Sequence, residues 1–381
     1  MNWNKVKFKK FITLQRGFDL PISEMKDGEI PVLGSTGIIG YHNKVKVNSP
    51  GVVTGRSGTI GLVQYADKPY WPHNTSLWVK DFKENNPKFI YYKLQTLKLN
   101  RFKGGASVPT LNRNNLDNLL VQIPDIPIQE EIASTLSAYD NLIDTNRRRI
   151  QLLEEAARLL FREWFVYFRF PGYEKVKIVD GEPEGWKTST VKDCISFISR
   201  GPSLDYISEG EDDGIPVLNQ RCIRNGEIDL DSVEHAKEVS LKQQDLYLKK
   251  FDILINSMGK GTLGRVSRNL SINHPMIIHN CITVVRANEN IFNQTILFYR
   301  LCAAQTYLET MGLGSTGQTS LKKEVIERIK ILIPPEELRD RFNSIIKPIW
   351  IKVGALKIQN KKLTQARDLL LPRLMSGEIE V

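Results

Sequence analysis

Apolar residues recur at alternating steps of four and three through the middle of the chain. Asn146 is the one polar member of the set, which is Ile132, Leu136, Tyr139, Ile143, Asn146, Ile150, Leu153, Ala157, Leu160 and Trp164. The same steps recur near the end, in Phe342, Ile346, Ile349, Val353, Leu356, Asn360, Leu363, Arg367 and Leu370. An amphipathic helix lying on a core shows such a stripe over about two heptads, whereas more than four are typical of a coiled coil. The pattern predicts two long helices that pack on each other.

Each stripe contains one asparagine, and the two asparagines fall at opposite heptad positions. Counting from Ile132 and from Phe342 as d positions makes Asn146 a d residue and Asn360 an a residue. Antiparallel helices set a against d, so the two amides can face each other and fix the register. The same register places Trp164 on Phe342. The stripes therefore predict an antiparallel coiled coil.

The segment before the first stripe is typical of a small mixed α/β lobe. Short apolar runs separated by Gly, Pro and Asn predict strands at residues 45–47, 51–54, 60–65 and 77–79, and a helix is predicted over 87–99. A glycine-rich loop at residues 104–110 follows, and a further stretch leads to Pro124.

The second half of the chain repeats the first. Motifs that return in the same order include Trp3 as Trp186, Arg16-Gly17 as Arg200-Gly201, Ile30–Leu33 as Ile215–Leu218, and His73-Asn74 as His279-Asn280. Beyond Pro124 and Pro334 the match keeps a constant offset of 210 residues. The repeat predicts an α+β fold with pseudo-two-fold symmetry, in which two homologous mixed α/β lobes are joined by two helices. The predicted domains are residues 1–126, 127–170, 171–334 and 335–381.

Composition and charge narrow the class of protein. The 381 residues are 41% hydrophobic and 25% charged, and no apolar run is long enough to cross a membrane. Four cysteines without a CxxC pair are typical of buried thiols, and we expect a cytoplasmic protein. Residues 1–128 carry 18 Lys and Arg against 9 Asp and Glu, whereas residues 171–334 carry 20 against 21. The basic first lobe favours a polyanionic partner, although a basic surface can also serve solubility alone.

Motifs for catalysis are not found. Asn86-Pro87-Lys88-Phe89 is close to the Asn-Pro-Pro-Phe signature of adenine methyltransferases, but it lacks the second proline and no glycine-rich cofactor loop precedes it. We interpret it as a helix start. The five histidines have no metal-ligand spacing. We expect a chain without a catalytic residue or a metal site.

Candidate recognition residues lie in the repeated loops. The segments Gly55–Gly58 and Ser257–Gly261 combine glycines, which let backbone amides approach phosphates, with a cation that can reach a phosphate or a guanine. The predicted DNA-binding residues are Arg16, Arg56, Ser57, Asn112, Arg113, Arg200, Lys260, Arg265, Gln318 and Thr319. A tight hairpin with its charge in water, or helix capping by residues 112–115, would explain the same residues.

An aromatic run, Trp164 to Phe170, ends the first helix. Phe165 and Phe168 fall outside the predicted seam and could bind a partner helix, because aromatic side chains are favoured at the centre of interfaces. The alternative is that both rings pack under the second lobe.

The repeat, together with the segments Ile128–Ala133 and Leu370–Ile379, resembles the specificity (S) subunit of type I restriction–modification systems. The resemblance covers essentially the whole chain and implies two target-recognition domains that each read one half of a split DNA sequence. It also implies two methyltransferase (M) subunits, which bind S-adenosylmethionine and carry out catalysis, and nuclease–translocase (R) subunits. The acidic stretch at residues 205–213 departs from a basic DNA-binding lobe.

Two other functions remain open at this point. A standalone DNA-binding or scaffold protein would need no modification partner. A methyltransferase with an unrecognised site would bind S-adenosylmethionine by itself. Over the 33 residues from Ile132 to Trp164, a helix spans about 50 Å, roughly one to one and a half turns of B-DNA, which favours a spacer between two DNA readers.

Overall fold

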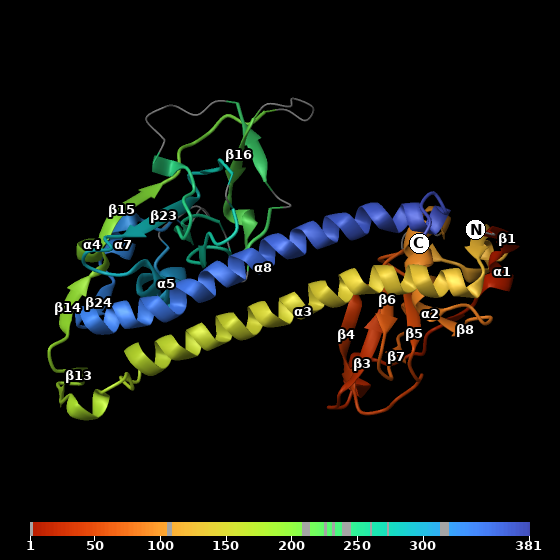
Figure 1. The fold of residues 1–381 in the computed structure, drawn as a ribbon, viewed down its shortest axis with the longest axis horizontal. Helices are drawn as coiled ribbons and strands as arrows, with labels where there is room; N and C mark the ends of the chain where they lie inside the picture. The colour runs from red at the N-terminus through yellow and green to blue at the C-terminus, as the bar shows by residue number, and fades with distance from the viewer. Residues whose placement is uncertain are drawn as a thin grey trace. The chain divides into compact units, whose positions relative to one another are not determined.

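The computed structural model of the 381-residue chain describes residues 3–104, 109–207, 214–224, 227–230, 233–237, 245–259, 261–272, 274–312 and 320–381. The chain forms two compact units. Unit 1 consists of Met1–Thr145 with Asn360–Val381, and unit 2 of Asn146–Gln359. Figure 1 shows that the two longest helices, α3 and α8, each contribute to both units.

Unit 1 is built on a four-stranded antiparallel sheet with the order β2 (Thr13–Arg16), β8 (Ser76–Asp81), β5 (Gly51–Gly55) and β6 (Val63–Ala66). Every residue of the central strand β5 is buried, and Leu77 and Val79 of β8 are buried beside it. A three-stranded sheet, β4 (Gly37–His42), β3 (Ile30–Gly34) and β7 (Trp71–Pro72), stands next to it. β1 (Trp3–Lys7) pairs with β11 (Leu120–Pro124).

Helix α2 (Pro87–Thr96) confirms the interpretation of the Asn-Pro motif as a helix start. The Asn86 side chain accepts a hydrogen bond from the backbone N–H of Phe89 at 3.0 Å, and Pro87 occupies the first turn, where its missing N–H is not needed. The helix packs on β5 and β6. The strand predicted at residues 45–47 is wrong, since only Val47 forms an isolated bridge, with Tyr70.

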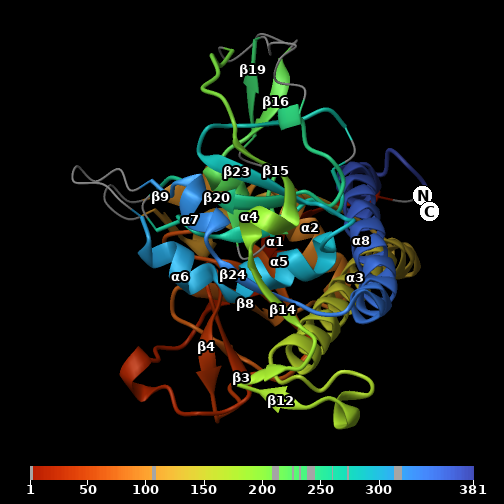
Figure 2. The same ribbon diagram turned by 90° about the vertical axis from the view of Figure 1, so that its left-hand side faces the viewer.

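Unit 2 repeats the strand order of unit 1, which confirms the duplication. The four-stranded sheet consists of β15 (Ile195–Arg200), β23 (Ile282–Ala287), β20 (Ile253–Asn256) and β21 (Val266–Arg268). Figure 2 shows it beneath the three-stranded sheet of β19 (Glu234–Ala236), β16 (Ile215–Leu218) and β22 (Ile277–Ile278). β14 (Lys187–Thr190) pairs with β24 (Lys330–Ile333), and α5 (Gln294–Ala303) corresponds to α2.

Shorter elements complete the described part of the chain. The α-helices are α1 (Phe8–Phe11), α4 (Val191–Cys194), α6 (Gln305–Thr310) and α7 (Lys323–Glu327). The strands are β9 (Lys103–Gly104), β10 (Thr110–Leu111), β12 (Ile178–Val179), β13 (Glu182–Pro183), β17 (Ile223–Arg224) and β18 (Glu227–Ile228). The 3₁₀ helices are η1 (Ile22–Glu24), η2 (Leu99–Phe102), η3 (Arg113–Leu116), η4 (Tyr173–Lys175) and η5 (Gln220–Cys222).

Helices α3 (Ile126–Phe165, 40 residues) and α8 (Glu336–Ser376, 41 residues) run antiparallel. In unit 1, Arg367 forms an ion pair with Asp140 at 2.7 Å. In unit 2, Lys357 Nζ lies 3.7 Å from Glu154 Oε1, and the ring centroids of Phe342 and Trp164 are 5.7 Å apart. The opposite order of these contacts along the two helices confirms the antiparallel prediction, and the last contact confirms the predicted register.

The two seam asparagines make hydrogen bonds inside their own units. Asn146 is fully buried, and its side-chain amide donates to Gln359 Oε1 at 3.2 Å. The Asn360 amide donates to the Ile143 carbonyl at 3.3 Å. A direct Asn146–Asn360 pair stays a prediction.

Both helices pack into the lobe cores as well as on each other. Ile132 and Leu136 of α3 and Leu374 and Met375 of α8 belong to the main core of unit 1. Phe161 and Trp164 belong to that of unit 2. Among the described helices, none is long and apolar enough to cross a membrane.

Candidate DNA-recognition interface

The repeated Arg-Gly and His-Asn motifs meet at one place in unit 1. Gly17 donates its backbone N–H to the Ser76 carbonyl at 3.0 Å, and a Cβ at this position would lie 2.1 Å from the His73 carbonyl oxygen. Only glycine fits so close to a backbone oxygen. The end of β2 is thereby held against the segment that contains the His73-Asn74 pair.

Four polar side chains form a network at this junction, which we call the recognition cluster: Arg16, Asp19, Arg56 and Asn74. The Arg16 guanidinium donates to Asp19 Oδ1 at 2.9 Å, and the Asn74 amide donates to the same carboxylate. Arg56 donates to the Asn74 carbonyl at 3.3 Å. The Arg16 and Asp19 side chains are 52% and 66% exposed, so both can exchange these bonds for bonds to a ligand.

The loop after residue 108 joins the recognition cluster through backbone bonds. Leu111 N–H donates to the Arg56 carbonyl at 2.8 Å, and Ser57 forms a bridge with Thr110. Asn112 caps η3, because its side chain accepts from the Asn114 N–H at 3.0 Å. Arg113 donates to the Leu14 carbonyl at 3.2 Å. The structure therefore brings together the five predicted site residues of the first lobe, and it assigns Asn112 the capping role that the sequence left open.

Unit 2 contains the same junction of backbone segments, but its arginine makes different hydrogen bonds. Gly201 lies against the carbonyls of Ile278 and His279, as Gly17 does against Pro72 and His73. Arg200, however, turns inward and donates to the Ser257 carbonyl at 2.9 Å and to Ser320 Oγ at 2.8 Å. Burial lowers the pKa of the Arg200 guanidinium. Its hydrogen bonds hold two loops together, whereas Arg16 faces the surface.

Backbone bonding identifies Ser257, and not Lys260, as the counterpart of Arg56. Ser257 N–H donates to the Cys281 carbonyl and its own carbonyl accepts from Leu321, as Arg56 bonds to Thr75 and Leu111. The sequence alone pairs Arg56 with Lys260, because each of the two repeated glycine loops contains a cation. Lys260, Gln318 and Thr319 lie outside the described residues. Arg265 is tethered, since it donates to the Gly261 carbonyl at 2.8 Å.

Phe165 and Phe168 pack inside unit 2. The Phe165 ring lies 4.8 Å from that of Phe342, and the Phe168 ring 5.5 Å from that of Trp186. Both rings are partly buried against the main core. This placement matches the alternative that they pack under the second lobe. Of the apolar and aromatic residues of this run, Val166 and Tyr167 are exposed, at 48% and 45%.

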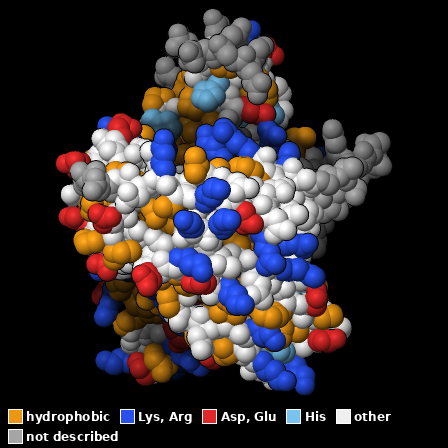
Figure 3. All heavy atoms as spheres, turned by 90° about the vertical axis from the view of Figure 1, so that its right-hand side faces the viewer, with side chains coloured by type: hydrophobic (Ala, Val, Ile, Leu, Met, Phe, Trp, Pro, Cys, Tyr) orange, Lys and Arg blue, Asp and Glu red, His pale blue; other side chains and the backbone are white. Residues whose placement is uncertain are grey.

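Two features of unit 1 were not predicted from the sequence. Asp19, which joins Arg16 to Asn74, has no motif of its own, because a single carboxylate near an Arg-Gly pair predicts no particular site. The second feature is a group of exposed lysines on β1 and α1: Lys5, Lys7, Lys9 and Lys10. Their close spacing in the sequence could have indicated a basic surface. Figure 3 shows Lys and Arg side chains gathered over the end of unit 1 where these elements lie.

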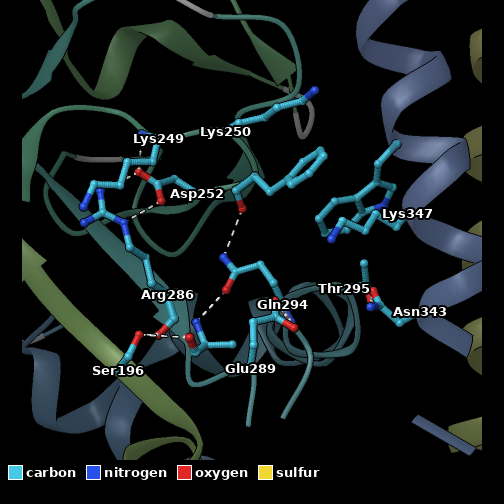
Figure 4. A pocket seen from close by; sticks show the side chains of 13 residues that line it. Ser196, Lys249, Lys250, Asp252, Arg286, Glu289, Gln294, Thr295, Asn343 and Lys347 are labelled. Carbon is cyan, nitrogen blue, oxygen red and sulfur yellow. Dashed lines mark hydrogen bonds and ion pairs between the residues drawn. The ribbon is translucent and has the colours of Figure 1, made fainter. Parts of the chain in front are cut away.

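A pocket of about 270 Å³ lies in unit 2 between the sheet, α5 and α8 (Figure 4). Arg286 binds the buried Asp252 through two bonds, at 2.6 and 2.7 Å. The Gln294 amide donates to the Phe251 and Val285 carbonyls, and Glu289 accepts the Gln294 N–H at the start of α5. Since these polar groups satisfy one another, we interpret the pocket as a structural joint. In the described part of the chain, no three His, Cys, Asp or Glu residues are grouped to hold a metal ion.

Two lobes with one topology, each with the same junction of an Arg-Gly and a His-Asn pair, define a duplicated protein with one candidate recognition junction in each lobe. The family model for the type I restriction modification DNA specificity domain matches residues 1–155 and 183–363, which is most of the chain. The chain therefore belongs to the DNA specificity subunits of type I restriction–modification systems. Members of this class are the non-catalytic subunits of type I complexes that act on DNA.

Similar proteins agree with this assignment. The specificity subunit of the type I restriction enzyme MjaIX from Methanocaldococcus jannaschii is 26% identical over 310 residues, with 77% of this chain and 69% of the relative covered. The HindI specificity subunit of Haemophilus influenzae is 22% identical over 361 residues, with 77% of each chain covered. The fold matches the crystal structure of the S subunit from M. genitalium with a TM-score of 0.68 at 18% identity, over 98% of this chain and 96% of that one.

Proposed function

We propose that each lobe reads one half of a bipartite DNA sequence. The supporting observation is that the same junction is built twice, on two copies of one topology, with side chains that differ. Arginine donates to guanine in the major groove, and a carboxylate accepts from the amino group of cytosine. At the surface of this junction, unit 1 offers Arg16 and Asp19, whereas unit 2 offers Ser203 and Asn280 because its Arg200 is bonded inward. The two lobes therefore offer different patterns of donors and acceptors. Different half-sites follow from different patterns.

Helices α3 and α8 set the number of base pairs between the two half-sites. α3 has 40 residues in one uninterrupted helix, which corresponds to about 60 Å at ~1.5 Å per residue. The antiparallel contacts in both units make the pair stiffer than one helix, so its length can act as a spacer.

The helices also provide the surface for the methyltransferase subunits. Leu152 and Leu159 lie on α3, and Val166 directly follows its last residue; the three are spaced at seven-residue steps, lie outside the predicted seam and are 53%, 45% and 48% exposed. An exposed apolar stripe of this spacing is typical of a helix that lacks its partner. We assign partner binding to this stripe in preference to Phe165 and Phe168. Two methyltransferase subunits supply S-adenosylmethionine and catalysis, and nuclease–translocase subunits join the complex.

Exchange of one lobe tests the proposal. Residues 1–126 are replaced by the first lobe of another family member, and the chain is expressed with its methyltransferase in a host without other methylation. Methylation mapping should show one changed half-site, with the other half and the spacer retained. A change in both halves would show that the lobes do not read independently. DNA binding by a chain that co-purifies with no methyltransferase would instead indicate a standalone DNA-binding protein.

A further inference from the structure

The β3–β4 hairpin presents apolar side chains that the core does not bury. Ile38, Ile39 and Tyr41 are 55%, 39% and 53% exposed. β4 is the edge strand of its sheet, because the strand order is β4-β3-β7. Figure 1 shows the hairpin extending from unit 1 away from α3. Three exposed apolar residues within four positions on an edge strand invite aggregation unless something covers them.

The hairpin is fixed to the recognition cluster. The Leu33 carbonyl accepts from the His73 N–H at 2.9 Å, and the Ser35 N–H donates to Thr75 Oγ1 at 3.3 Å. The Thr75 carbonyl in turn accepts from the Arg56 N–H at 2.8 Å. The turn of the hairpin and the loop with Arg56 therefore bind the same residue, Thr75. A ligand held by Arg56 lies beside the hairpin.

A β-bulge turns Ile39 toward this side. Val32 pairs with Gly40 and Leu33 with Ile38, so Ile39 is the extra residue between them. A Cβ on Gly34 would lie 2.8 Å from Ile39 Cγ2 and 3.3 Å from Thr75 Oγ1, so Ile39 shares a face with Thr75. Ile38 pairs with Leu33 and shares its face, which is the opposite one because consecutive residues of a strand alternate.

The occupant of this face that fits best is the major groove of duplex DNA. The groove is about 12 Å wide and admits a two-stranded β-ribbon. The loop with Arg56 is bound to the same Thr75 as the hairpin, and the exposed Lys44 and Lys46 follow β4, so cations for the phosphates lie near it. Within the major groove, the one apolar group that base pairs present is the 5-methyl group of thymine.

We infer that the β3–β4 hairpin enters the major groove and that Ile39 contacts the 5-methyl group of a thymine in the half-site read by the first lobe. This inference rests on the proposed function of that lobe. It predicts that the half-site contains at least one A·T pair whose thymine methyl contributes to binding. Loss of one buried methyl group corresponds to about fourfold weaker binding.

The experiment uses the full chain with its methyltransferase. Selection from a random duplex library gives the bound sequence, and the lobe exchange described above assigns the half-site. Each thymine of that half-site is then replaced in turn by deoxyuridine, which removes only the methyl group. The wild type should lose about fourfold in affinity at one position. Ile39→Ala should bind both duplexes equally, Ile39→Val should keep part of the difference, and the matched control Ile38→Ala should keep all of it.

The outcomes separate this inference from the proposed function. A complex that selects no sequence at all contradicts the proposed function. A complex that selects a sequence but ignores every thymine methyl overturns the role of Ile39, as does an Ile39→Ala variant that remains sensitive or a half-site without an A·T pair. Weaker assembly with the methyltransferase in Ile39→Ala, at unchanged DNA selection, would show that the face binds protein and would also overturn the inference.

Discussion

The repeated Arg-Gly motif shows how one residue pair takes two roles. Gly17 and Gly201 occupy the same place because each approaches a carbonyl too closely for a side chain. The adjacent arginines differ because their neighbours differ. The Arg200 guanidinium donates to Ser257 and Ser320, whereas that of Arg16 pairs with the exposed Asp19. A sequence motif can predict the glycine, whose role is local, but not the direction of the arginine, which depends on residues far along the chain.

Arg56 lies in a loop that backbone hydrogen bonds to Thr75 and Leu111 hold in place, which makes it a candidate cation for recognition. Arg56→Ala should weaken specific DNA binding by about 1–3 kcal/mol if the guanidinium contacts a base. If it contacts only a phosphate, binding should fall alike for all sequences, and the slope of log K against log salt should decrease by ~1. Titration of labelled duplexes at several salt concentrations distinguishes the two. Lys83→Ala is the control, because Lys83 forms a surface pair with Asp81 at 2.7 Å. Unchanged binding and slope in Arg56→Ala would make the loop structural.

Lys93 of α2 provides a test of unit 1 that does not involve DNA. Its side chain is 5% exposed and donates to the Met375 carbonyl at 2.7 Å, near the end of α8. Burial lowers the pKa of Lys93 to about 8. Between pH 8 and the ordinary pKa of about 10.4, the unfolded chain binds more protons at this residue than the folded chain, so stability should rise with pH in this window.

The comparison is between the wild type and Lys93→Met, in which the buried stem is kept and the charge removed. The midpoint of thermal unfolding of the wild type should rise relative to that of the variant as the pH increases from 8 to 10. Other titrating groups cancel in this difference. A constant difference across the range would mean that Lys93 is not desolvated as the structure indicates.

Among the larger elements, the long helices were predictable and the contacts of the hairpin were not. A seam of more than four heptads and two asparagines at opposite positions determine the direction of packing without knowledge of the lobes. α3 begins at Ile126, six residues before the first seam residue Ile132, and Ile128 of its first turn packs against the core of unit 1. The short strands depended on long-range pairing, so residues 45–47, apolar in pattern, form only a bridge at Val47.

Gly354 lies inside α8, where a glycine ordinarily lowers helix stability. A Cβ at this position would lie 2.2 Å from the Leu270 carbonyl oxygen. Gly→Ala in a helix interior usually stabilises by about 1 kcal/mol, but here the helix must move away from the lobe. We expect Gly354→Ala to destabilise unit 2 by about 1–3 kcal/mol in denaturant unfolding. The exposed neighbour Lys352→Ala should remain within about 0.5 kcal/mol of the wild type. A stabilised Gly354→Ala would show that α8 does not approach Leu270.

For the whole molecule, duplication explains why the helices and the lobes can change separately. Each unit has its own core and its own recognition junction, and each helix takes part in both cores. A new lobe must keep the apolar positions that face the helices, but its loops are free to change. The two lobes share one topology but differ in charge: residues 1–128 carry a net charge of +9, whereas residues 171–334 carry 20 Lys and Arg against 21 Asp and Glu.

The spacer should depend on helix length alone. Seven residues inserted in α3 after Asn146, with seven inserted in α8 after Gln359, keep the heptad pattern where these two side chains bond. The methylated sequence should keep both half-sites and gain base pairs between them. Matched insertion of two residues in each helix breaks the seam, and we expect methylation to be lost. Unchanged spacing after the seven-residue insertion would show that the helices do not set the distance.

Methylation mapping of the host genome, with and without this gene, tests the central claim most directly. We predict an interrupted motif, with two specified half-sites separated by unspecified base pairs, that disappears when the gene is deleted and returns when it is restored. An uninterrupted motif that depends on this gene, or an interrupted motif that persists in its absence, would contradict the account of one chain with two DNA-reading lobes.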